Sequence, residues 1–235
     1  MENIIFTDGS SRGNPGNGGW GVVVIHSSKD VNEIGGREEH TTNNRMELTS
    51  VIEALSIVDV GSKNIVYTDS SYLINGITKW IKGWKKNGWI TKTKEEVLNR
   101  DLWERLDDLV QERVVDFKYI GGHVGIVGNE RCDVIATSFA DNKKVELYEG
   151  SIDNYPIEDI LNISADEMKI KEKNYKNSNK NTKAYSYVSK VDGVIQIHKS
   201  WAECEKRVKG AKKALYKKAL SKENEDSIIH DFSNR

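Results

Sequence analysis

Residues 6–16 read Phe6-Thr7-Asp8-Gly9-Ser10-Ser11-Arg12-Gly13-Asn14-Pro15-Gly16, with an acidic residue between an apolar run and a glycine-rich turn. The residues before it, 3–6, are typical of a short buried strand. Residues 18–25 predict a second strand, so the glycines and Pro15 form a hairpin connection. We therefore expect Asp8 at a strand end, beside backbone that carries few side chains to block a ligand.

A single aspartate before a turn says little, because Asp is favoured in turns for local hydrogen-bonding reasons. Three further acidic residues stand in equally specific surroundings: Glu47 in TTNNRMEL, Asp69 in YTDS and Asp133 in GNERCD. The presence of four acidic residues in such specific surroundings favours a shared function for the four carboxylates over four unrelated structural roles.

The pattern of apolar residues predicts an α/β fold. Three successive strands, joined by short connections as in an antiparallel meander, are expected at 4–6, 20–27 and 31–39. From residue 43 the apolar period becomes helical until Gly61, which places Glu47 in the first turn of a helix. A strand at 63–68 then predicts a parallel crossover. Asp69 follows that strand at its C-terminal end, where α/β sheets commonly build their sites.

The next elements alternate in the same way. Further segments are expected as a helix at 70–81, a helix at 101–112, a strand at 114–120 and a helix at 129–140 that carries Asp133. His123 lies in the glycine-rich loop 121–128, which is too permissive to hold a fixed shape easily. A histidine on such a loop is more suggestive of function than one on an apolar face, whereas Glu130 at a helix start has an ordinary capping explanation.

A basic and aromatic segment lies between Lys79 and Arg100. It holds seven basic residues against two acidic ones, although the net charge of the whole chain is −1. Such local positive fields favour phosphate binding. Trp103, in an amphipathic helix, is expected in the core. Trp80 and Trp84 share a helical face, and they are either core anchors or an aromatic surface with cationic flanks that suits sugars and bases.

Length and composition limit the classes of protein to which this chain can belong. At 235 residues with 37% hydrophobic and 30% charged residues, the chain is long enough for one large domain or for two domains with a core of moderate size. No apolar span approaches the ~20 residues of a transmembrane helix, and no basic leader is present. We expect a cytoplasmic location and no membrane partner. Cys132 and Cys204 lack ligands at zinc spacing and are expected to be reduced packing residues.

Six motifs in fixed order resemble type I ribonuclease H over residues 1 to about 140: TDGSSRGNPG, TTNNRMEL, YTDSSY, WIKGWKKNGW, NRDLWERL and GHVGIVGNERCD. The resemblance implies an α/β fold with a five-stranded mixed sheet, three antiparallel strands plus parallel strands, flanked by helices. It also implies an endonuclease that hydrolyses the RNA strand of RNA–DNA hybrids by two-metal-ion catalysis and leaves 5′-phosphate and 3′-hydroxyl ends. The order of our predicted segments agrees with that fold.

By that resemblance Asp8, Glu47, Asp69 and Asp133 are catalytic metal ligands for two Mg²⁺ ions, with Mn²⁺ as a substitute. The chemistry suits carboxylates, because two ions activate a water and stabilise the leaving oxygen of an anionic phosphodiester. Without metal, four clustered carboxylates repel one another. His123 matches the family's flexible-loop histidine, which is given an auxiliary role in proton transfer or product release.

The resemblance also implies which residues contact the RNA–DNA hybrid. Asn14, Asn43 and Asn44 match positions that bind 2′-hydroxyls, and asparagine can both donate and accept. Ser71 stands where relatives often carry a longer Gln or Met. The remaining positions carried over are Thr42 and Asn99 in a pocket for a DNA phosphate, and Trp80, Trp84, Lys85 and Lys86 along the DNA groove.

The periodic pattern of apolar residues becomes weaker after residue 140. Residues 141–182 are expected to form a linker, close to low complexity at 174–182, although 155–170 holds enough Ile and Leu to pack as a short helix. Residues 183–235 predict a small ββαβα domain with a hairpin around 191–193 and a helix capped by Ser200.

This C-terminal module carries SWAEC, VKG and AxYKKALS elements that resemble the hybrid-binding, viroplasmin-like domain of many eukaryotic ribonucleases H, where it is N-terminal. By resemblance Trp201, Tyr216, Lys217 and Lys218 contact the duplex backbone. In the alternative interpretation, the two aromatics belong to the core and the lysines are solvated charges.

Two other functions compete with a ribonuclease H. The first is a catalytically silent hybrid-binding protein, against which the four carboxylates argue. The second is another nuclease on the same fold, such as a transposase or integrase, because fold alone does not fix function. The 2′-hydroxyl asparagines and the tryptophan–lysine stretch favour ribonuclease H. No obligatory protein partner is evident.

Overall fold

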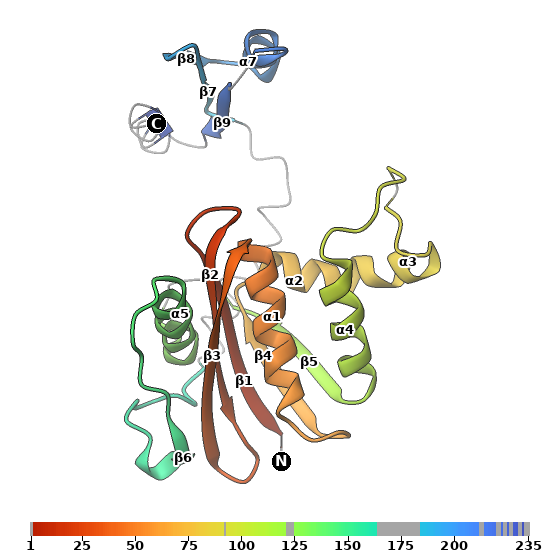
Figure 1. Cartoon of the computed structure of the whole chain (residues 1–235), viewed down its shortest axis with the longest axis vertical. Helices are drawn as coiled ribbons and strands as arrows, with labels where there is room; N and C mark the ends of the chain where they lie inside the picture. The colour runs from red at the N-terminus through yellow and green to blue at the C-terminus, as the bar shows by residue number, and fades with distance from the viewer. Residues whose placement is uncertain are drawn as a thin grey trace. The chain divides into compact units, whose positions relative to one another are not determined.

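The structure is a computed structural model that describes residues 2–91, 93–120, 125–163, 184–211 and 214–219, together with 222, 225, 228, 229 and 232. The chain divides into two compact units, Met1–Glu172 and Lys173–Arg235, and each is considered by itself (Figure 1). Within the described part of the chain, no helix combines the length and the apolar character needed to cross a membrane.

A six-stranded mixed sheet forms the centre of the first unit, in the order β5-β4-β1-β2-β3-β6. Its strands are β1 (Asn3–Ser11), β2 (Gly16–Ile25), β3 (Asp30–Thr41), β4 (Lys63–Thr68), β5 (Val114–Tyr119) and β6 (Glu149–Ser151). The first three strands pair antiparallel, whereas β4 runs parallel to both β1 and β5. The predicted mixed sheet is confirmed. A sixth strand, β6, extends it antiparallel to β3 and was not expected from the sequence.

The helices of this unit are α1 (Asn43–Ser56), α2 (Ser71–Asn75), a π-helix (Gly76–Trp80), α3 (Ile81–Lys86), α4 (Arg100–Gln111) and α5 (Val127–Ala140). The single helix that we predicted at 70–81 is therefore three consecutive segments. Gly76 packs against the buried Trp103 ring, where a Cβ atom would come within 2.0 Å, so this position admits no larger residue.

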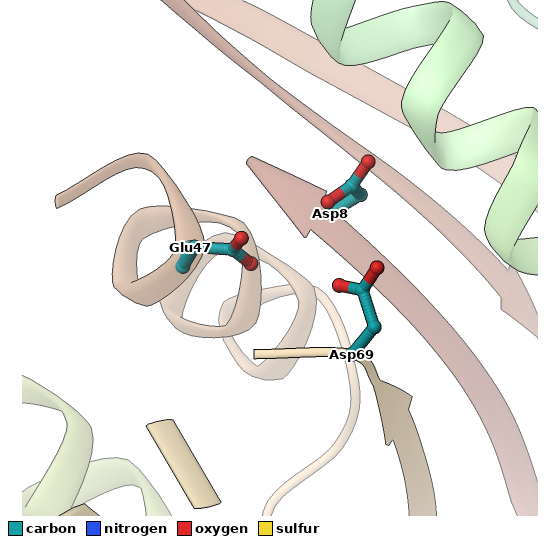
Figure 2. Close-up of side chains that lie close together, drawn as sticks. All are labelled: Asp8, Glu47 and Asp69. Carbon is teal, nitrogen blue, oxygen red and sulfur yellow. The ribbon is translucent and has the colours of Figure 1, made fainter. Parts of the chain in front are cut away.

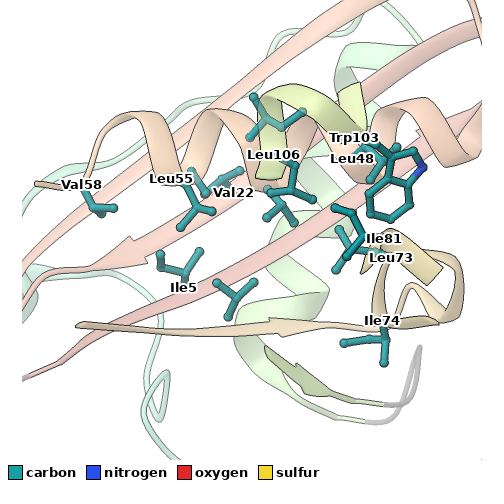
Figure 3. Close-up of a cluster of buried hydrophobic side chains, with 14 of the residues drawn as sticks. Ile5, Val22, Leu48, Leu55, Val58, Leu73, Ile74, Ile81, Trp103 and Leu106 are labelled. Atoms are coloured by element: carbon teal, nitrogen blue, oxygen red, sulfur yellow. The ribbon is translucent and has the colours of Figure 1, made fainter. Parts of the chain in front are cut away.

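Strand alternation divides the core into two layers. Ile5, Val22 and Val66 face the cluster that includes α1, α2 and α4, and Figure 3 shows side chains of this cluster. The neighbouring residues Phe6 and Val23 face the opposite side, with α5. Successive side chains of a strand point to opposite faces, so adjacent apolar residues serve different layers. Trp103 is fully buried in the first layer, as predicted.

The segment after α5 packs against the sheet. Beyond β6 it forms a 3₁₀ turn (Ile152–Asn154) and then buries Tyr155 and Ile160 in the same cluster as α5. Residues 141–163 of the predicted linker are thus ordered structure, although 155–163 forms bends and turns rather than the short helix we expected. The rest of the predicted linker, 164–182, lies outside the described residues.

The second unit contains a three-stranded antiparallel sheet in the order β8-β7-β9. Its elements are β7 (Ser186–Val191), β8 (Val194–His198), α7 (Trp201–Val208) and β9 (Leu215–Ala219). Ser200 caps α7 by accepting a hydrogen bond from the Glu203 N–H at 3.3 Å, as predicted. Residues 222, 225, 228, 229 and 232 are helical, which agrees with the expected closing helix. Val188, Ala219, Ile228 and Phe232 form the core.

Candidate metal centre and nucleic-acid interface

Two of the predicted ligands are brought together by strand register. β1 and β4 run parallel, and Phe6 lies opposite Tyr67. Asp8 and Asp69, each two residues further along, therefore stand at the same level on neighbouring strands, which are about 4.8 Å apart in a sheet. Asp69 follows the end of β4, as predicted. Asp8 does not lie at a strand end, because β1 continues to Ser11.

Glu47 reaches the same place from α1. It lies one turn into the helix rather than in its first turn. The approach depends on Gly9, where a Cβ atom would lie 2.3 Å from the backbone nitrogen of Glu47. Carboxylate oxygen atoms of Asp8, Glu47 and Asp69 all lie within 4.8 Å of one another, and Figure 2 shows the three groups converging.

Asp133 approaches from the opposite face of the sheet, on α5. Gly21 lies opposite Asp8 in the β1–β2 register, and a Cβ atom there would be 2.4 Å from the Cys132 carbonyl oxygen. The glycine thus allows α5 to lie close to the sheet. Asp133 is near enough to Asp8 to affect its protonation through charge and a side-chain hydrogen bond. It stands beside Asp8 rather than within the group of three.

The surroundings make ionisation of these carboxyl groups costly. The pKa of Asp8 is raised from 3.8 to about 8, chiefly by burial and then by the charges of Asp69 and Asp133. The Gly9 N–H, 2.8 Å from Asp8 Oδ1, acts in the opposite direction. Burial also raises the pKa of Glu47 well above its ordinary value, followed by the charges of Asp8 and Asp69.

The donor set fits a hard divalent cation. Glu47 Oε1 accepts a hydrogen bond from Asn43 Nδ2 at 3.2 Å, whereas Oε2 is buried and has no hydrogen-bond partner within the described structure. A buried carboxylate oxygen without a partner is costly, and a cation would satisfy it. Oxygen donors alone, without sulfur or imidazole, are typical of sites for Mg²⁺ or Mn²⁺.

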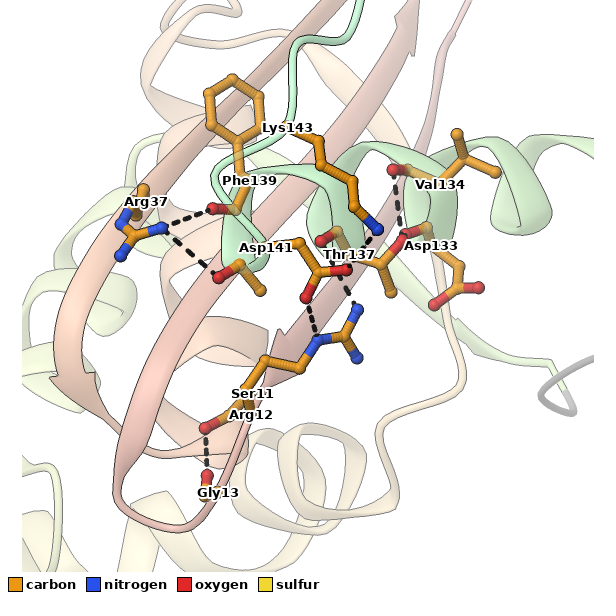
Figure 4. Close-up of polar contacts among 11 residues, drawn as sticks. Ser11, Arg12, Gly13, Arg37, Asp133, Val134, Thr137, Phe139, Asp141 and Lys143 are labelled. Carbon is orange, nitrogen blue, oxygen red and sulfur yellow. Dashed lines mark hydrogen bonds and ion pairs between the residues drawn. The ribbon is translucent and has the colours of Figure 1, made fainter.

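Two arginines fix the C-terminal end of α5 (Figure 4). Arg37 donates from Nη1 to the carbonyl oxygens of Phe139 and Ala140, both at 3.4 Å. These carbonyls belong to the last turn, where backbone acceptors lack helical partners. Arg12, at the start of the β1–β2 connection, pairs with Asp141 just beyond the helix. The hairpin that carries Asn14 is therefore tied to the helix that carries Asp133.

The three asparagines predicted to contact ribose lie at one rim of the carboxylate cluster. Asn14, Asn43 and Asn44 are exposed, and Asn14 Oδ1 accepts a hydrogen bond from the Asn43 N–H at 3.3 Å. The side chain of Asn43 also holds Glu47, so this rim is contiguous with the cluster. Ser71 is exposed at the start of α2, two residues after Asp69.

Thr42 and Asn99, predicted to bind a phosphate, stand at the starts of α1 and α4. A bidentate ion pair joins these two helix ends, since Arg45 donates to the two carboxylate oxygens of Asp101 at 3.1 and 2.8 Å. Thr42 Oγ1 accepts from the Arg45 N–H at 3.4 Å, and Asn99 donates to the Tyr72 hydroxyl at 3.2 Å. Adjacent helix N-termini favour anions.

Trp80 and Trp84 form an aromatic surface rather than core anchors alone. Their ring centroids are 5.6 Å apart, and Trp84 also packs on Trp103 at 5.5 Å. Trp80 remains 37% exposed. Lys85 pairs with Asp107, whereas Lys86 is exposed. The residues that line the neighbouring groove are Lys79, Trp80, Gly83, Trp84, Asn87 and Ile90.

The C-terminal module displays its own aromatic surface. Trp201 and Tyr216 are 40% and 54% exposed, so the interpretation that places them in the core is wrong. Trp201 lies between Tyr187 and Tyr216, with centroid distances of 5.6 and 5.5 Å. Lys217 and Lys218 are adjacent in β9 and therefore lie on opposite faces of the sheet. Only Lys218 shares a face with Tyr216.

His123 and Glu130 are two further residues that the sequence analysis singled out near the start of α5. His123 lies outside the described residues, so its predicted role stays a prediction. Glu130 Oε1 accepts a hydrogen bond from the Gly125 N–H at 3.1 Å, which agrees with a structural capping role. Gly9 and Gly21 were not singled out from the sequence, although runs of glycine within strands indicate close approach by another backbone.

Comparisons with known proteins agree with this geometry. The family model described as RNase H matches residues 1–141, more than half of the chain. The chain belongs to the ribonuclease H family. Ribonuclease H from Thermosynechococcus vestitus is 49% identical over 146 residues, covering 61% of this chain and 91% of that protein. Ribonuclease H from Alcanivorax borkumensis is 47% identical over 141 residues, covering 60% and 93%.

A solved structure and a second family model extend the comparison. The crystal structure of LC9-RNase H1, described as a type 1 RNase H with the type 2 active-site motif, is 27% identical, with a TM-score of 0.56 over 68% of this chain and 83% of that one. The model described as the ribonuclease H1 N-terminal domain matches residues 190–224. The chain is thus an enzyme of the ribonuclease H family whose second unit is similar to that N-terminal domain.

The raised pKa of Asp8 predicts how stability depends on pH when metal is absent. Between pH 4 and 8 the folded protein binds more protons at Asp8 than the unfolded chain, so stability falls as pH rises through this range. Asp8→Asn keeps an acceptor for the Gly9 N–H but carries no charge. We expect it to raise the metal-free free energy of unfolding at pH 9 by on the order of 2 kcal/mol, with little gain at pH 4.

Thermal and urea unfolding in EDTA at pH 4, 7 and 9 measure this difference. Asp116→Asn is a matched control, because Asp116 is an exposed aspartate of β5 that pairs with Lys118 at the surface. A stabilisation by Asp8→Asn that is equal at all three pH values, or shared by Asp116→Asn, would contradict the assignment.

Proposed function

We propose that this chain hydrolyses the RNA strand of RNA–DNA hybrids as a metal-dependent endonuclease, leaving 5′-phosphate and 3′-hydroxyl ends. The observation that carries the proposal is the convergence of Asp8, Glu47 and Asp69, whose oxygen atoms lie within 4.8 Å of one another. Membership of the ribonuclease H family supports it, since the relatives named ribonuclease H are matched over nine-tenths of their length.

In this proposal Asp8, Glu47, Asp69 and Asp133 hold two Mg²⁺ ions, or Mn²⁺ in their place. The bound ions supply an activated water and neutralise charge at the leaving oxygen. The protein prepares the ligands: Asn43 fixes one oxygen of Glu47, and the Gly9 N–H fixes one oxygen of Asp8. His123 keeps its proposed auxiliary role in proton transfer or product release.

Substrate selection follows from the rim around the carboxylates. Asn14, Asn43 and Asn44 offer donors and acceptors to the 2′-hydroxyls that distinguish RNA from DNA. Asn43 also contacts Glu47, which places a bound ribose beside a ligand. On the DNA strand, Thr42 and Asn99 bind a phosphate at two joined helix starts. Ser71, Trp80, Trp84, Lys85 and Lys86 supply the remaining contacts in this proposal.

Each of the two competing functions leaves one feature of the site without an explanation. A silent hybrid-binding protein has no need for a buried carboxylate oxygen without a partner, as Glu47 Oε2 is. A transposase or integrase on the same fold has no need for asparagines along the rim. Cleavage of end-labelled RNA–DNA hybrid, double-stranded RNA and double-stranded DNA, each with Mg²⁺, Mn²⁺ or EDTA, separates the three functions.

Asp69→Asn is expected to lower hybrid cleavage at saturating Mg²⁺ by about a thousandfold, because the metal supplies several kcal/mol of transition-state stabilisation. The amide preserves the shape of the side chain and removes its charge. Steady-state cleavage of a labelled hybrid measures the loss. Asp116→Asn, which removes an exposed aspartate from β5, should retain the parent rate. Cleavage by Asp69→Asn at the parent rate would remove Asp69 from the catalytic centre.

We further propose that the C-terminal module binds the hybrid backbone through the aromatic surface of Tyr187, Trp201 and Tyr216, with Lys218 on the same face. Two aromatic residues that stay 40% and 54% exposed are costly for a soluble surface unless they meet a partner. Because Lys217 lies on the other face of β9, it is the weakest of the four contacts suggested by the resemblance.

Trp201→Ala in the full chain is expected to weaken hybrid affinity by about tenfold, within the range of aromatic contacts to nucleic acid. Cleavage at saturating hybrid should change little, because the carboxylate cluster lies in the first unit. Tyr185→Ala is a matched control, since Tyr185 is also an exposed aromatic of the module, at 52%. Fluorescence anisotropy with labelled hybrid measures the affinities, and equal effects of both substitutions would refute a specific role for Trp201.

A further inference from the structure

A buried polar cluster joins α5 to the segment that follows it. The carboxylate of Glu33, on β3, accepts hydrogen bonds from Arg131 Nε and Nη2 at 2.7 and 2.6 Å. The Tyr155 hydroxyl donates to Glu33 Oε1 at 2.6 Å, and the Tyr148 N–H donates to Oε2 at 3.0 Å. Arg131 Nη2 also reaches the Glu146 carbonyl at 2.6 Å. We call Glu33, Arg131, Tyr155 and the backbone N–H of Tyr148 the Glu33 cluster.

This cluster specifies one arrangement of its parts. The side chain of Glu33 is fully buried, and a buried charge is tolerated only when its partners are in place. Burial alone would raise the pKa of Glu33, but the bonds from Arg131, Tyr155 and the Tyr148 N–H outweigh it and lower the pKa. Every bond therefore goes to an ionised carboxylate, and losing one partner leaves an incompletely satisfied buried charge.

Much of the cluster comes from outside the part of the chain that matches the family model. That match ends at residue 141, whereas Glu146, Tyr148 and Tyr155 follow it. The segment 142–163 reaches back across β3 to contact Glu33, and Tyr155 is buried against α5 and the sheet. The segment therefore holds Arg131 from the side opposite the carboxylates.

The Glu33 cluster constrains α5 near the ligand it carries. Arg131 and Asp133 are two residues apart, which corresponds to about 200° around the helix axis. A rotation of α5 that separates Arg131 from Glu33 thus also moves Asp133 relative to Asp8. Gly21 allows the close approach of α5 to the sheet, and the Glu33 cluster adds a constraint on its rotation.

We propose that the Glu33 cluster positions Asp133 for the metal centre through α5, so that residues 142–163 are part of the catalytic unit. The proposal rests on the proposed role of Asp133 as a metal ligand. Glu33, Arg131 and Tyr155 are positioning residues, because they act through the helix and form no part of the carboxylate group of Asp8, Glu47 and Asp69.

Tyr155→Phe in the full chain tests the proposal, because it removes one hydrogen bond to Glu33 and keeps the buried ring. Tyr148→Phe is the matched control: it removes the hydroxyl bond to the Ser151 carbonyl at 2.7 Å, in the same segment, and preserves the N–H that holds Glu33. Three quantities are measured in both variants: amide hydrogen exchange without metal, the rise in melting temperature with Mn²⁺, and the Mg²⁺ dependence of hybrid cleavage.

Tyr155→Phe should speed amide hydrogen exchange in α5 more than in α1. It should also reduce the rise in melting temperature that Mn²⁺ produces. It should raise the Mg²⁺ concentration for half-maximal cleavage by about threefold to tenfold, below the effect of groups that bond a ligand directly. The rate at saturating Mg²⁺ should stay within about twofold, since excess metal compensates for a misplaced ligand. Tyr148→Phe should resemble the parent, and Arg131→Lys should exceed Tyr155→Phe in the same direction.

Faster exchange spread evenly over the first unit, or an unchanged Mg²⁺ dependence in Tyr155→Phe, would overturn the positioning role. Equal shifts in Tyr155→Phe and Tyr148→Phe would do the same, because they would reflect general loosening of the segment. If the parent chain cleaves no hybrid with any metal, the proposed function fails instead. The exchange and Mn²⁺ measurements then still decide whether the Glu33 cluster orients α5.

Discussion

Burial and like charge oppose ionisation where Asp8, Glu47 and Asp69 meet, and the first unit holds the three side chains together against this repulsion. Asp8, Glu47 and Asp69 lie within 4.8 Å of one another, and burial together with like charge raises the pKa values of Asp8 and Glu47. Such an arrangement persists only where the surrounding structure holds it. The β1–β4 register, the close contact at Gly9 and the α5 contact at Gly21 supply that support. The fold thus holds together an acidic group that could bind a cation.

The grouping of Asp8, Glu47 and Asp69 could be predicted because the signals around each residue are local. Strand alternation, a helix start within TTNN and an acidic residue after YT are all visible in short windows of sequence. Other features depend on partners far away in the chain. The need for glycine at position 76 follows from its contact with the ring of Trp103, 27 residues later. The ordering of residues 142–163 follows from bonds between Glu33 and residues more than 100 positions later, which leave no periodic pattern.

The resemblance predicted contacts residue by residue, and the structure shows which of those residues lie together. Asn14 and Asn43 share a hydrogen bond, and Asn43 also bonds Glu47, so these two predicted contacts lie beside the carboxylates. The C-terminal module shows the limit. Lys217 and Lys218 were transferred as a pair, yet strand alternation puts them on opposite faces. Trp201 and Tyr216 were ambiguous between core and surface, since an aromatic residue in a small domain serves either role until its neighbours are known.

We expect protons to occupy the carboxylate cluster until a cation replaces them. Calorimetric titration of the chain with Mn²⁺ in buffers of different ionisation enthalpy counts the protons released per bound ion. With the pKa of Asp8 at about 8 and that of Glu47 also raised, we predict release of about one proton or more per ion at pH 6.5, decreasing towards zero above pH 9. Mn²⁺ binding without proton release at pH 6.5 would show that the carboxylates are already ionised before the ion binds.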